Sequence, residues 1–156
     1  MHKTNAARLL DSRGIHYDLA EYDVDENDLS AVTLAGKIGQ DPSQIFKTLV
    51  LRGDKTGVFV AVIPGDQEVD LKKAARVSGN KNAAMVHMKE LLALTGYIRG
   101  GCSPLGMKKP YPVFIHETCR LYDLIFISAG LRGLQLKIHP EDLIKVSGAM
   151  VCDISI

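Results

Sequence analysis

The hydrophobic positions of this chain fall into two kinds of short segment. One kind has apolar residues at helical spacing, begins after a capping residue and ends at a glycine, as between Thr4 and Gly14. The other kind is a run of β-branched and other apolar residues between turn residues, which is typical of strands. The first kind predicts helices over residues 5–13, 31–38, 71–78, 89–94 and 140–146. The second predicts strands over residues 15–22, 45–51, 58–63, 83–86, 113–115, 121–127, 134–138 and 149–154.

Strands outnumber helices in this pattern, and hairpins are mixed with helical crossovers. The polar segment 53–57 connects two strands as a hairpin, so the chain does not follow a regular βαβ alternation. It contains no internal repeat, low-complexity tract or linker. We therefore predict a single domain over residues 1–156, of the α/β class, with one mixed and partly barrel-like β-sheet surrounded by helices.

Composition narrows the class of protein without choosing a function. Hydrophobic residues make up 46% of the chain and charged residues 24%, the balance of an ordinary globular protein. No apolar run approaches the roughly 20 residues that span a bilayer, and the N-terminal segment lacks the apolar stretch of a signal peptide. We expect a cytoplasmic protein without a membrane partner. The formal charge of +1 does not indicate DNA binding, although a local basic patch is enough to contact RNA.

The cysteines and histidines do not indicate a metal or a cofactor. Cys102, Cys119 and Cys152 lie far apart and form no CxxC pair, so neither a disulfide framework nor a zinc site is predicted. His87 and Glu90 can share a helical face, but two ligands do not make a metal site. We predict no metal and no cofactor.

Lys47 is a charged residue in the middle of an apolar strand. An unpaired buried charge is very costly, so this ammonium must reach water or an anionic partner. If its face of the strand lines a pocket, Lys47 can hold a phosphate or polarise an ester carbonyl. A lysine on a solvated edge strand explains the pattern equally well.

The segment 96–106 is rich in glycine and includes the pair Gly100 and Gly101. Adjacent glycines let a backbone approach a ligand and aim N–H groups at it, as an oxyanion hole or a phosphate nest requires. The loop lacks the Gly-Lys-Ser/Thr ending of a Walker loop. A simple turn is the alternative.

A second glycine-rich segment, 128–133, lies between two predicted strands. Ser128 follows an apolar strand, so its hydroxyl is expected near the end of that strand, where α/β sites often lie. Arg132 can meet a phosphate. A hairpin with a solvated arginine is an equally good interpretation.

Four segments in order resemble the successive signatures of the YbaK/EbsC family. They are Phe46–Leu49, Asp70–Ala75, Gly96–Gly106 and Ser128–Leu134. The resemblance covers nearly the whole chain, and four such segments at this spacing are specific, although each alone is not. The family is similar to the editing domain of bacterial prolyl-tRNA synthetases. The resemblance implies a YbaK-like editing domain that deacylates mischarged tRNA(Pro), chiefly Cys-tRNA(Pro), with prolyl-tRNA synthetase as a candidate partner.

The resemblance also implies roles for individual residues. Matched by position, the expected catalytic residues are Lys47, Gly100, Gly101 and Ser128. Lys47 would hold the end of the tRNA or the substrate carbonyl, and the two glycines would turn their N–H groups toward the ester. The expected substrate-binding residues are Tyr22, Ser30, Thr48, Ser103, Pro104, Gly130, Arg132 and Gln135.

Two positions depart from the pattern of some family members. An aromatic residue of the acidic loop would correspond to Leu29 or Ser30, and an acidic residue after the later loop would correspond to Gln135. Both departures concern the selectivity for the amino acid more than the reaction.

The implied reaction is an acyl transfer, which needs a group that stabilises the oxyanion and a nucleophile. The chain has no Gly-x-Ser-x-Gly elbow and no serine with an evident histidine partner. In the family, the thiol of the substrate cysteine is thought to attack the ester carbonyl and release a cyclic thiolactone, which is our leading hypothesis. Cys102 is the alternative nucleophile, but no histidine lies near it in the sequence, and a small apolar filler is the favoured role.

Lys72, Lys73 and Arg76 fall on one side of a predicted helix. A solvated helix face is the usual explanation, and contact with tRNA phosphates is the other, which the resemblance favours. Two alternative functions stay open for the whole chain. One is an Ala-tRNA(Pro) deacylase, and the other is a non-catalytic module that binds tRNA or a synthetase without hydrolysis.

Overall fold

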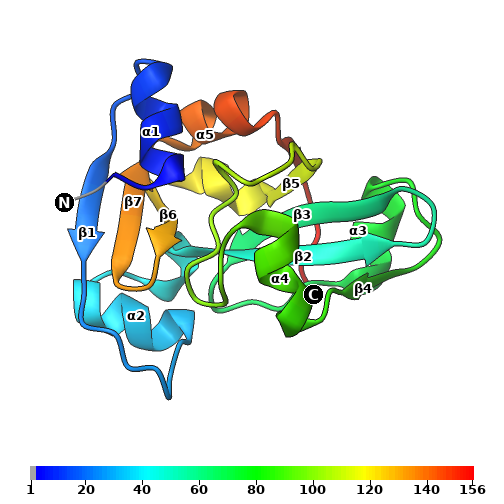
Figure 1. Ribbon diagram of the computed structural model, residues 1–156, viewed down its shortest axis with the longest axis horizontal. Helices are drawn as coiled ribbons and strands as arrows, with labels where there is room; N and C mark the ends of the chain where they lie inside the picture. Colours follow the sequence, from blue (N-terminus) through cyan, green and yellow to red (C-terminus); the bar gives the residue numbers. More distant parts are fainter. Residues whose placement is uncertain (1–2) are drawn as a thin grey trace.

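The structure, a computed structural model, describes residues 3–156 (Figure 1). Its helices are α1 (Asn5–Ser12), α2 (Ala31–Ile38), α3 (Leu71–Val77), α4 (Met88–Thr95) and α5 (Pro140–Ser147), with short 3-10 turns η1 (Pro42–Gln44) and η2 (Glu117–Leu121). Its strands are β1 (Asp18–Glu21), β2 (Phe46–Gly53), β3 (Gly57–Pro64), β4 (Ala83–Met85), β5 (Val113–His116), β6 (Ile125–Leu131), β7 (Leu134–Ile138) and β8 (Met150–Cys152).

Local capping chemistry sets the helix boundaries. The Thr4 hydroxyl accepts a hydrogen bond from the Ala7 N–H at 3.1 Å, and Asp70 accepts from the N–H groups of Lys72 and Lys73 at 3.0 Å. Gly39 ends α2 in the left-handed conformation, with φ +70°. The helix positions predicted from capping and periodicity are therefore confirmed to within a residue or two.

The strands form two sheets. A three-stranded antiparallel sheet has the order β1-β7-β6, and a five-stranded mixed sheet has the order β4-β2-β3-β5-β8. In the larger sheet β4, β2 and β3 are antiparallel, whereas β3, β5 and β8 are parallel. A single parallel bridge, Ile45 to Phe126, links the two sheets. In Figure 1 the smaller sheet lies beside α1 and α2, the larger sheet extends away from it, and α4 crosses in front of β2.

The α/β class and the mixed sheet are confirmed, but the expected single curled sheet is instead two sheets that do not close into a barrel. The backbone hydrogen bonds do not continue from one sheet to the other, because β6 contacts the residue before β2 only at the Ile45–Phe126 bridge. The pairing of β6 with β7 also shifts register between Ser128 and Leu131. Three strand predictions also began too early or ran too long, and the third, over residues 149–154, is strand only at β8. Residues 15–17 lie outside β1. The strand predicted over residues 121–127 begins only at Ile125, because Leu121 ends η2, a turn that the His116 ring caps by accepting a hydrogen bond from the Thr118 N–H at 3.3 Å.

The largest core cluster joins the two sheets to α1 and α5. It includes Leu10, Phe46, Ile127, Leu136 and Leu143, each 0–1% exposed. This packing fixes the start of β2 against β6 and β7, which is where the candidate site lies. Within residues 3–156 no helix has the length and apolar character needed to cross a membrane.

Candidate functional site

A cavity of about 650 Å³ lies where the start of β2 faces β6, β7, the glycine-rich loop and the N-terminal end of α2. Six of the predicted site residues line it: Ser30, Lys47, Thr48, Gly100, Ser128 and Gln135. Segments more than 100 residues apart in the sequence therefore contribute to one concave surface. Leu29, which the sequence marked only as a departure from the family pattern, also lines it, as do Val32, Asp66 and Glu68, which the sequence did not single out.

Lys47 lines this cavity from β2. Its side chain is 27% exposed, and its Nζ lies 3.7 Å from Glu68 Oε1, whose side chain is 80% exposed. β2 pairs with β3 along its whole length, whereas β4 pairs only with Leu51–Gly53. The strand edge beside Lys47 is therefore open on the cavity side. Because the Glu68 side chain is largely exposed and its contact is long, this pair is weak, and the ammonium is available to an anionic or carbonyl group of a ligand.

Two buried polar atoms at the cavity have no hydrogen-bond partner among the described residues. They are Thr48 Oγ1 and Gln135 Oε1. Gln135 is only 3% exposed and lies on β7 directly opposite Ser128 of β6, so the two side chains point to the same side of the sheet. A buried polar atom without a partner costs about 1–3 kcal/mol. A ligand with polar groups can satisfy both atoms.

Ser128 is 8% exposed, and its Oγ accepts a hydrogen bond from the Gly130 N–H at 3.1 Å. No histidine is among the residues that line the cavity in the described part of the chain. Within residues 3–156 the hydroxyl also makes no hydrogen bond to a basic side chain, which an activated serine nucleophile needs, although it can donate its proton to a ligand.

The two glycines of the loop have different environments. Gly100 has φ +84° and lines the cavity. The prediction that both N–H groups face the ester is wrong for Gly101, because its N–H donates to the Ile98 carbonyl at 2.9 Å. A Cβ on Gly101 would lie 3.1 Å from the Arg132 backbone nitrogen, so this glycine permits close packing of the loop on the β6–β7 turn.

Four predicted substrate-binding residues support the loop instead of lining the cavity. The Ser103 hydroxyl is buried and accepts from the Leu105 N–H at 3.3 Å, and Pro104 is buried beside it. Gly130 has φ +103° and lies against the Tyr97 ring. Arg132 Nε donates to the Arg99 carbonyl at 2.8 Å and so ties the β6–β7 turn to the glycine-rich loop.

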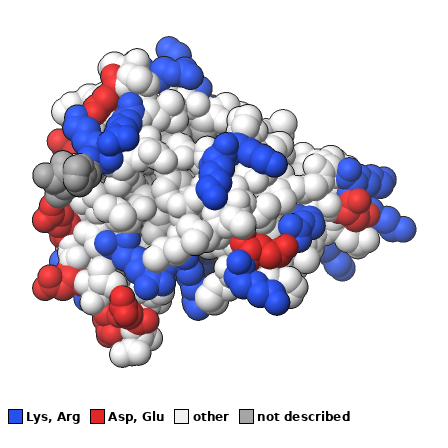
Figure 2. Space-filling view, in the orientation of Figure 1, with Lys and Arg blue, Asp and Glu red and all other residues white. Residues whose placement is uncertain are grey.

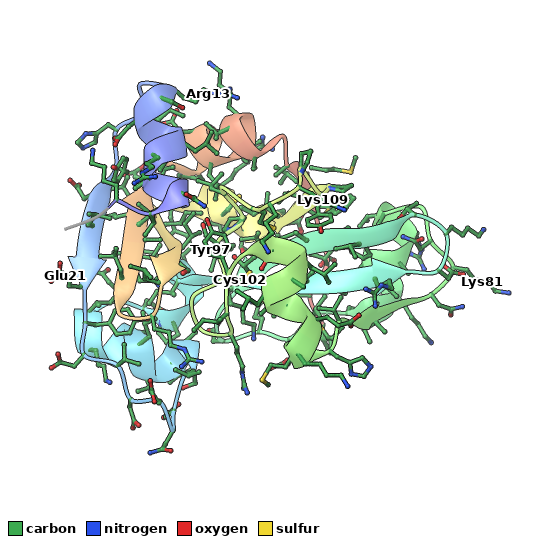
Figure 3. All side chains as sticks on the ribbon, viewed as in Figure 1. Arg13, Glu21, Lys81, Tyr97, Cys102 and Lys109 are labelled. Atoms are coloured by element: carbon green, nitrogen blue, oxygen red, sulfur yellow. The ribbon has the colours of Figure 1, made fainter. Side chains whose placement is uncertain are left out.

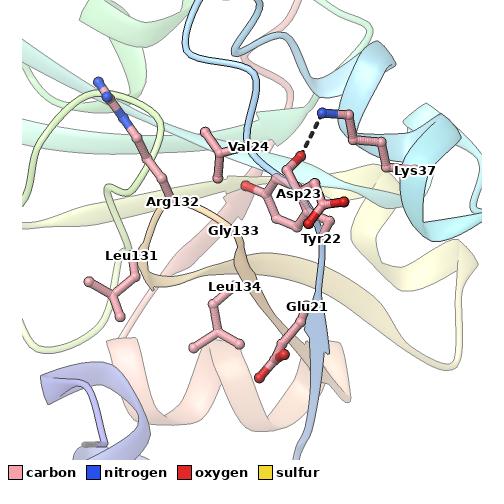
Figure 4. Close-up of a pocket in the computed structure, with 9 residues that line it drawn as sticks. All are labelled: Glu21, Tyr22, Asp23, Val24, Lys37, Leu131, Arg132, Gly133 and Leu134. Carbon is pink, nitrogen blue, oxygen red and sulfur yellow. Dashed lines mark hydrogen bonds between the residues drawn. The ribbon is translucent and has the colours of Figure 1, made fainter. Parts of the chain in front are cut away.

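Tyr22 lies outside the main cavity. It borders a separate depression of about 700 Å³ together with Lys37 and Arg132, and Lys37 donates to the Asp23 carbonyl there (Figure 4). A small pocket lined by both Tyr22 and Ser30 lies between the depression and the cavity. Tyr22 is therefore a neighbour of the site across the acidic loop, and not one of its walls.

Cys102 touches the cavity but is poorly placed to react. It is 8% exposed, and burial raises the pKa of its thiol to about 12. Figure 3 shows it near Tyr97 at the centre of the view, and the two residues share one core cluster. The thiolate is the reactive form of cysteine, so this environment disfavours Cys102 as a nucleophile and supports the filler role.

The predicted RNA-binding helix is only partly available. Lys73 Nζ donates to Asp153 Oδ2 and to the Ser155 carbonyl, both at 2.9 Å, so it holds the C-terminal segment. Lys72 and Arg76 are exposed, but no residue of α3 lines the cavity. On the face of the molecule that Figure 2 shows, lysine and arginine side chains are spread out and do not gather into one patch.

Comparison with known proteins gives a consistent family. The model of the aminoacyl-tRNA editing domain matches residues 25–146. A protein of Enterococcus faecalis (strain ATCC 700802 / V583), named "Putative Cys-tRNA(Pro)/Cys-tRNA(Cys) deacylase EbsC", is 47% identical over 153 residues, which are 98% of this chain and 93% of that protein. The protein YwhH of Bacillus subtilis (strain 168) is 31% identical over 134 residues, 84% of this chain and 85% of that protein.

Solved structures share the fold. One, described as a "putative trans-editing enzyme for prolyl tRNA synthetase", has a TM-score of 0.86 and 28% identity, and the match covers 100% of this chain and 99% of that chain. Another, of the hypothetical protein APE2540, has a TM-score of 0.89 and 24% identity over 98% of this chain and 100% of that chain. The latter supports the architecture alone.

Proposed function

The chain belongs to the aminoacyl-tRNA editing domain family, and from this premise we propose that it removes cysteine from mischarged Cys-tRNA(Pro). Two comparisons support this proposal: the relative at 47% identity is named a "Putative Cys-tRNA(Pro)/Cys-tRNA(Cys) deacylase", and a structure with the same fold is described as a "putative trans-editing enzyme for prolyl tRNA synthetase". The partners of this proposal are mischarged tRNA(Pro) and, for handover of the tRNA, prolyl-tRNA synthetase.

The observation that carries the mechanism is a cavity with groups for an oxyanion but no activated nucleophile among the described residues. Lys47 offers an ammonium, and the Gly100 N–H makes no hydrogen bond within residues 3–156. Both can stabilise the negative charge that develops on an ester carbonyl oxygen. Burial favours the protonated form of the Cys102 thiol, and within residues 3–156 no basic side chain makes a hydrogen bond to the Ser128 hydroxyl.

We assign the attack to the thiol of the substrate cysteine. Its sulfur bonds to the ester carbonyl carbon and forms a tetrahedral oxyanion next to Lys47. Collapse of this intermediate breaks the bond to the ribose oxygen, which takes up the proton that the thiol loses. The products are the free tRNA end and a four-membered thiolactone, which water opens to cysteine. The short intramolecular path supplies the orientation that a protein nucleophile would otherwise provide.

The buried polar atoms favour a small polar amino acid with a free ammonium. Gln135 Oε1 and Thr48 Oγ1 can each accept a hydrogen bond from the α-ammonium group, which would relieve their lack of a partner. Such a contact fixes the amino acid so that its side chain lies near the carbonyl carbon. It does not by itself select cysteine, because the selection comes from the reactivity of the thiol.

The experiment is to measure release of labelled amino acid from tRNA(Pro) charged with cysteine, serine, alanine or proline. Fast loss of cysteine with slow loss of serine, which has a poorer nucleophile of nearly the same shape, supports the thiol mechanism. Serine or alanine lost as fast as cysteine keeps the editing function but refutes the thiol mechanism. If all four esters survive, the catalytic proposal fails, and a tRNA-binding module, tested by filter binding of uncharged tRNA(Pro), takes its place.

A further inference from the structure

A second concave region opens directly beside the cavity. It has a volume of about 360 Å³ and lies between β2, β4, α4 and the glycine-rich loop. Thr48, Leu49, Arg99, Gly100 and Cys102 border both regions. We call it the methionine groove, because its outer walls are Met85 and Met88. Its volume is within the roughly 300–1,000 Å³ of sites for small ligands.

The methionine groove is apolar and built on a rigid base. Its floor includes Val50, which is 2% exposed, whereas Met85 and Met88 are 46% and 62% exposed at its rim. Glu90 of α4 pairs with Arg52 of β2 through two contacts of 3.2 and 3.3 Å, which holds the helix against the strand. Exposed methionines at the rim of a groove with fixed walls are suited to bind a flat aromatic ligand, because thioether sulfur interacts favourably with aromatic rings.

We propose that the methionine groove binds the 3′-terminal adenine of the aminoacyl-tRNA while the ester lies in the adjoining cavity. This inference rests on the proposed function, since it places a second part of the same substrate. The amino acid is esterified to the terminal ribose, so the terminal base must lie within one nucleoside of the carbonyl carbon. The methionine groove shares Thr48 and Gly100 with the cavity, so it directly adjoins the space in which the ester would lie.

Charge determines from which side the nucleic acid approaches. The far wall of the cavity carries Asp28, Asp66 and Glu68, which repel phosphate. The border with the methionine groove instead carries Arg99, which makes no ion pair within residues 3–156 and whose carbonyl is held by Arg132 Nε at 2.8 Å. A cation at this border can contact the phosphate that precedes the terminal nucleoside.

The other depression fits a terminal nucleotide less well. Around Tyr22 the carboxylates Glu21 and Asp23 offset the cations Lys37 and Arg132, and the depression shares no residue with the cavity (Figure 4). Basic residues continue instead beyond α4. The Lys108 side chain passes over Gly96 at the end of this helix, and Lys109 lies above α4 in Figure 3. The tRNA strand can therefore leave the methionine groove along a positively charged surface.

The test uses the whole protein with ¹³C-labelled methionine methyl groups, observed by NMR. Addition of AMP or of the trinucleotide CCA is expected to shift the Met85 and Met88 signals and to leave Met150, which is 54% exposed on β8, unchanged. Met85→Ala and Met88→Ala are each expected to raise KM for the aminoacyl-tRNA about 2- to 10-fold with little change in kcat. Met150→Ala is the matched control and should behave as wild type.

The results separate this inference from the proposed function. Methyl shifts with AMP in a protein that hydrolyses no ester would refute the editing activity and keep the nucleotide site. Rapid hydrolysis with unshifted Met85 and Met88 signals and an unchanged KM for both variants would overturn the groove assignment. An effect of Met88→Ala that appears only when prolyl-tRNA synthetase is present would also overturn it, because the surface would then bind a protein.

Discussion

Replacing Lys47 with methionine removes the ammonium of the cavity while keeping most of the length and volume of the side chain. The contacts around Lys47 predict that this change affects stability little. Its ionic partner, Glu68, is 3.7 Å away and its side chain is 80% exposed. Exposed ion pairs of this kind contribute about 0.2–1 kcal/mol. For a chain of this size that corresponds to a fall in Tm of no more than roughly 4 °C.

The expected effect on catalysis is much larger. If Lys47 stabilises the oxyanion, its loss should lower kcat by about 100- to 1,000-fold, or roughly 3–4 kcal/mol in the barrier. The two effects differ enough to separate catalysis from folding. Glu68→Gln should leave most of the activity, because it removes the weak partner and keeps the ammonium.

The assay is single-turnover deacylation of Cys-tRNA(Pro), with a thermal denaturation curve for each variant. Lys55→Met, at the exposed tip of the β2–β3 hairpin, is the matched control and should keep wild-type activity. Retention by Lys47→Met of more than about a third of the wild-type rate would refute the catalytic role. A large fall in Tm would instead mean that Lys47 holds the fold.

Three further outcomes are expected. Cys102→Ala should keep its deacylation rate within about threefold, and iodoacetamide at pH 8 should not inactivate the wild type, because a thiol with a pKa of about 12 is only about one part in ten thousand thiolate there; rapid inactivation prevented by the variant would restore Cys102 as nucleophile. Gly130→Ala should lower Tm by roughly 2–12 °C, since φ is +103° and the new Cβ would lie 2.8 Å from Tyr97 Cε1, and an unchanged Tm would contradict the geometry. The hydrogen bond from Lys73 lowers the pKa of Asp153 in the folded protein. The ionised Asp153 therefore stabilises the fold fully above the pKa of the unfolded chain, about 3.9, and this stabilisation is lost as the pH falls through the pKa of the folded protein. Asp153→Asn should therefore have a lower Tm at pH 7 and the same Tm as wild type in strong acid, and an equal difference at both pH values would rule this out.

The sequence determined most of the local structure. Caps such as Thr4 and Asp70 act through their own side chains on backbone groups two or three residues away, so their signal is complete within a short window. Lys47 was conspicuous for a similar reason, because a charge inside an apolar strand needs a special environment wherever the strand packs. The resemblance of four segments, in order, to one family then predicted that residues far apart in the sequence form a single site, which no local pattern could predict.

Tertiary structure decided how the individual residues are used. Gly101 and Lys73 were expected to face a ligand, yet Gly101 donates to Ile98 and Lys73 holds Asp153 and the Ser155 carbonyl. The partner of Lys73 lies 80 residues away, and no local pattern encodes which donor reaches it first. The two-sheet arrangement and the methionine groove depend in the same way on long-range packing. The sequence determines which side chain stands at each position. Which hydrogen-bond donors and cavities stay available to a ligand depends on the contacts that distant segments make first.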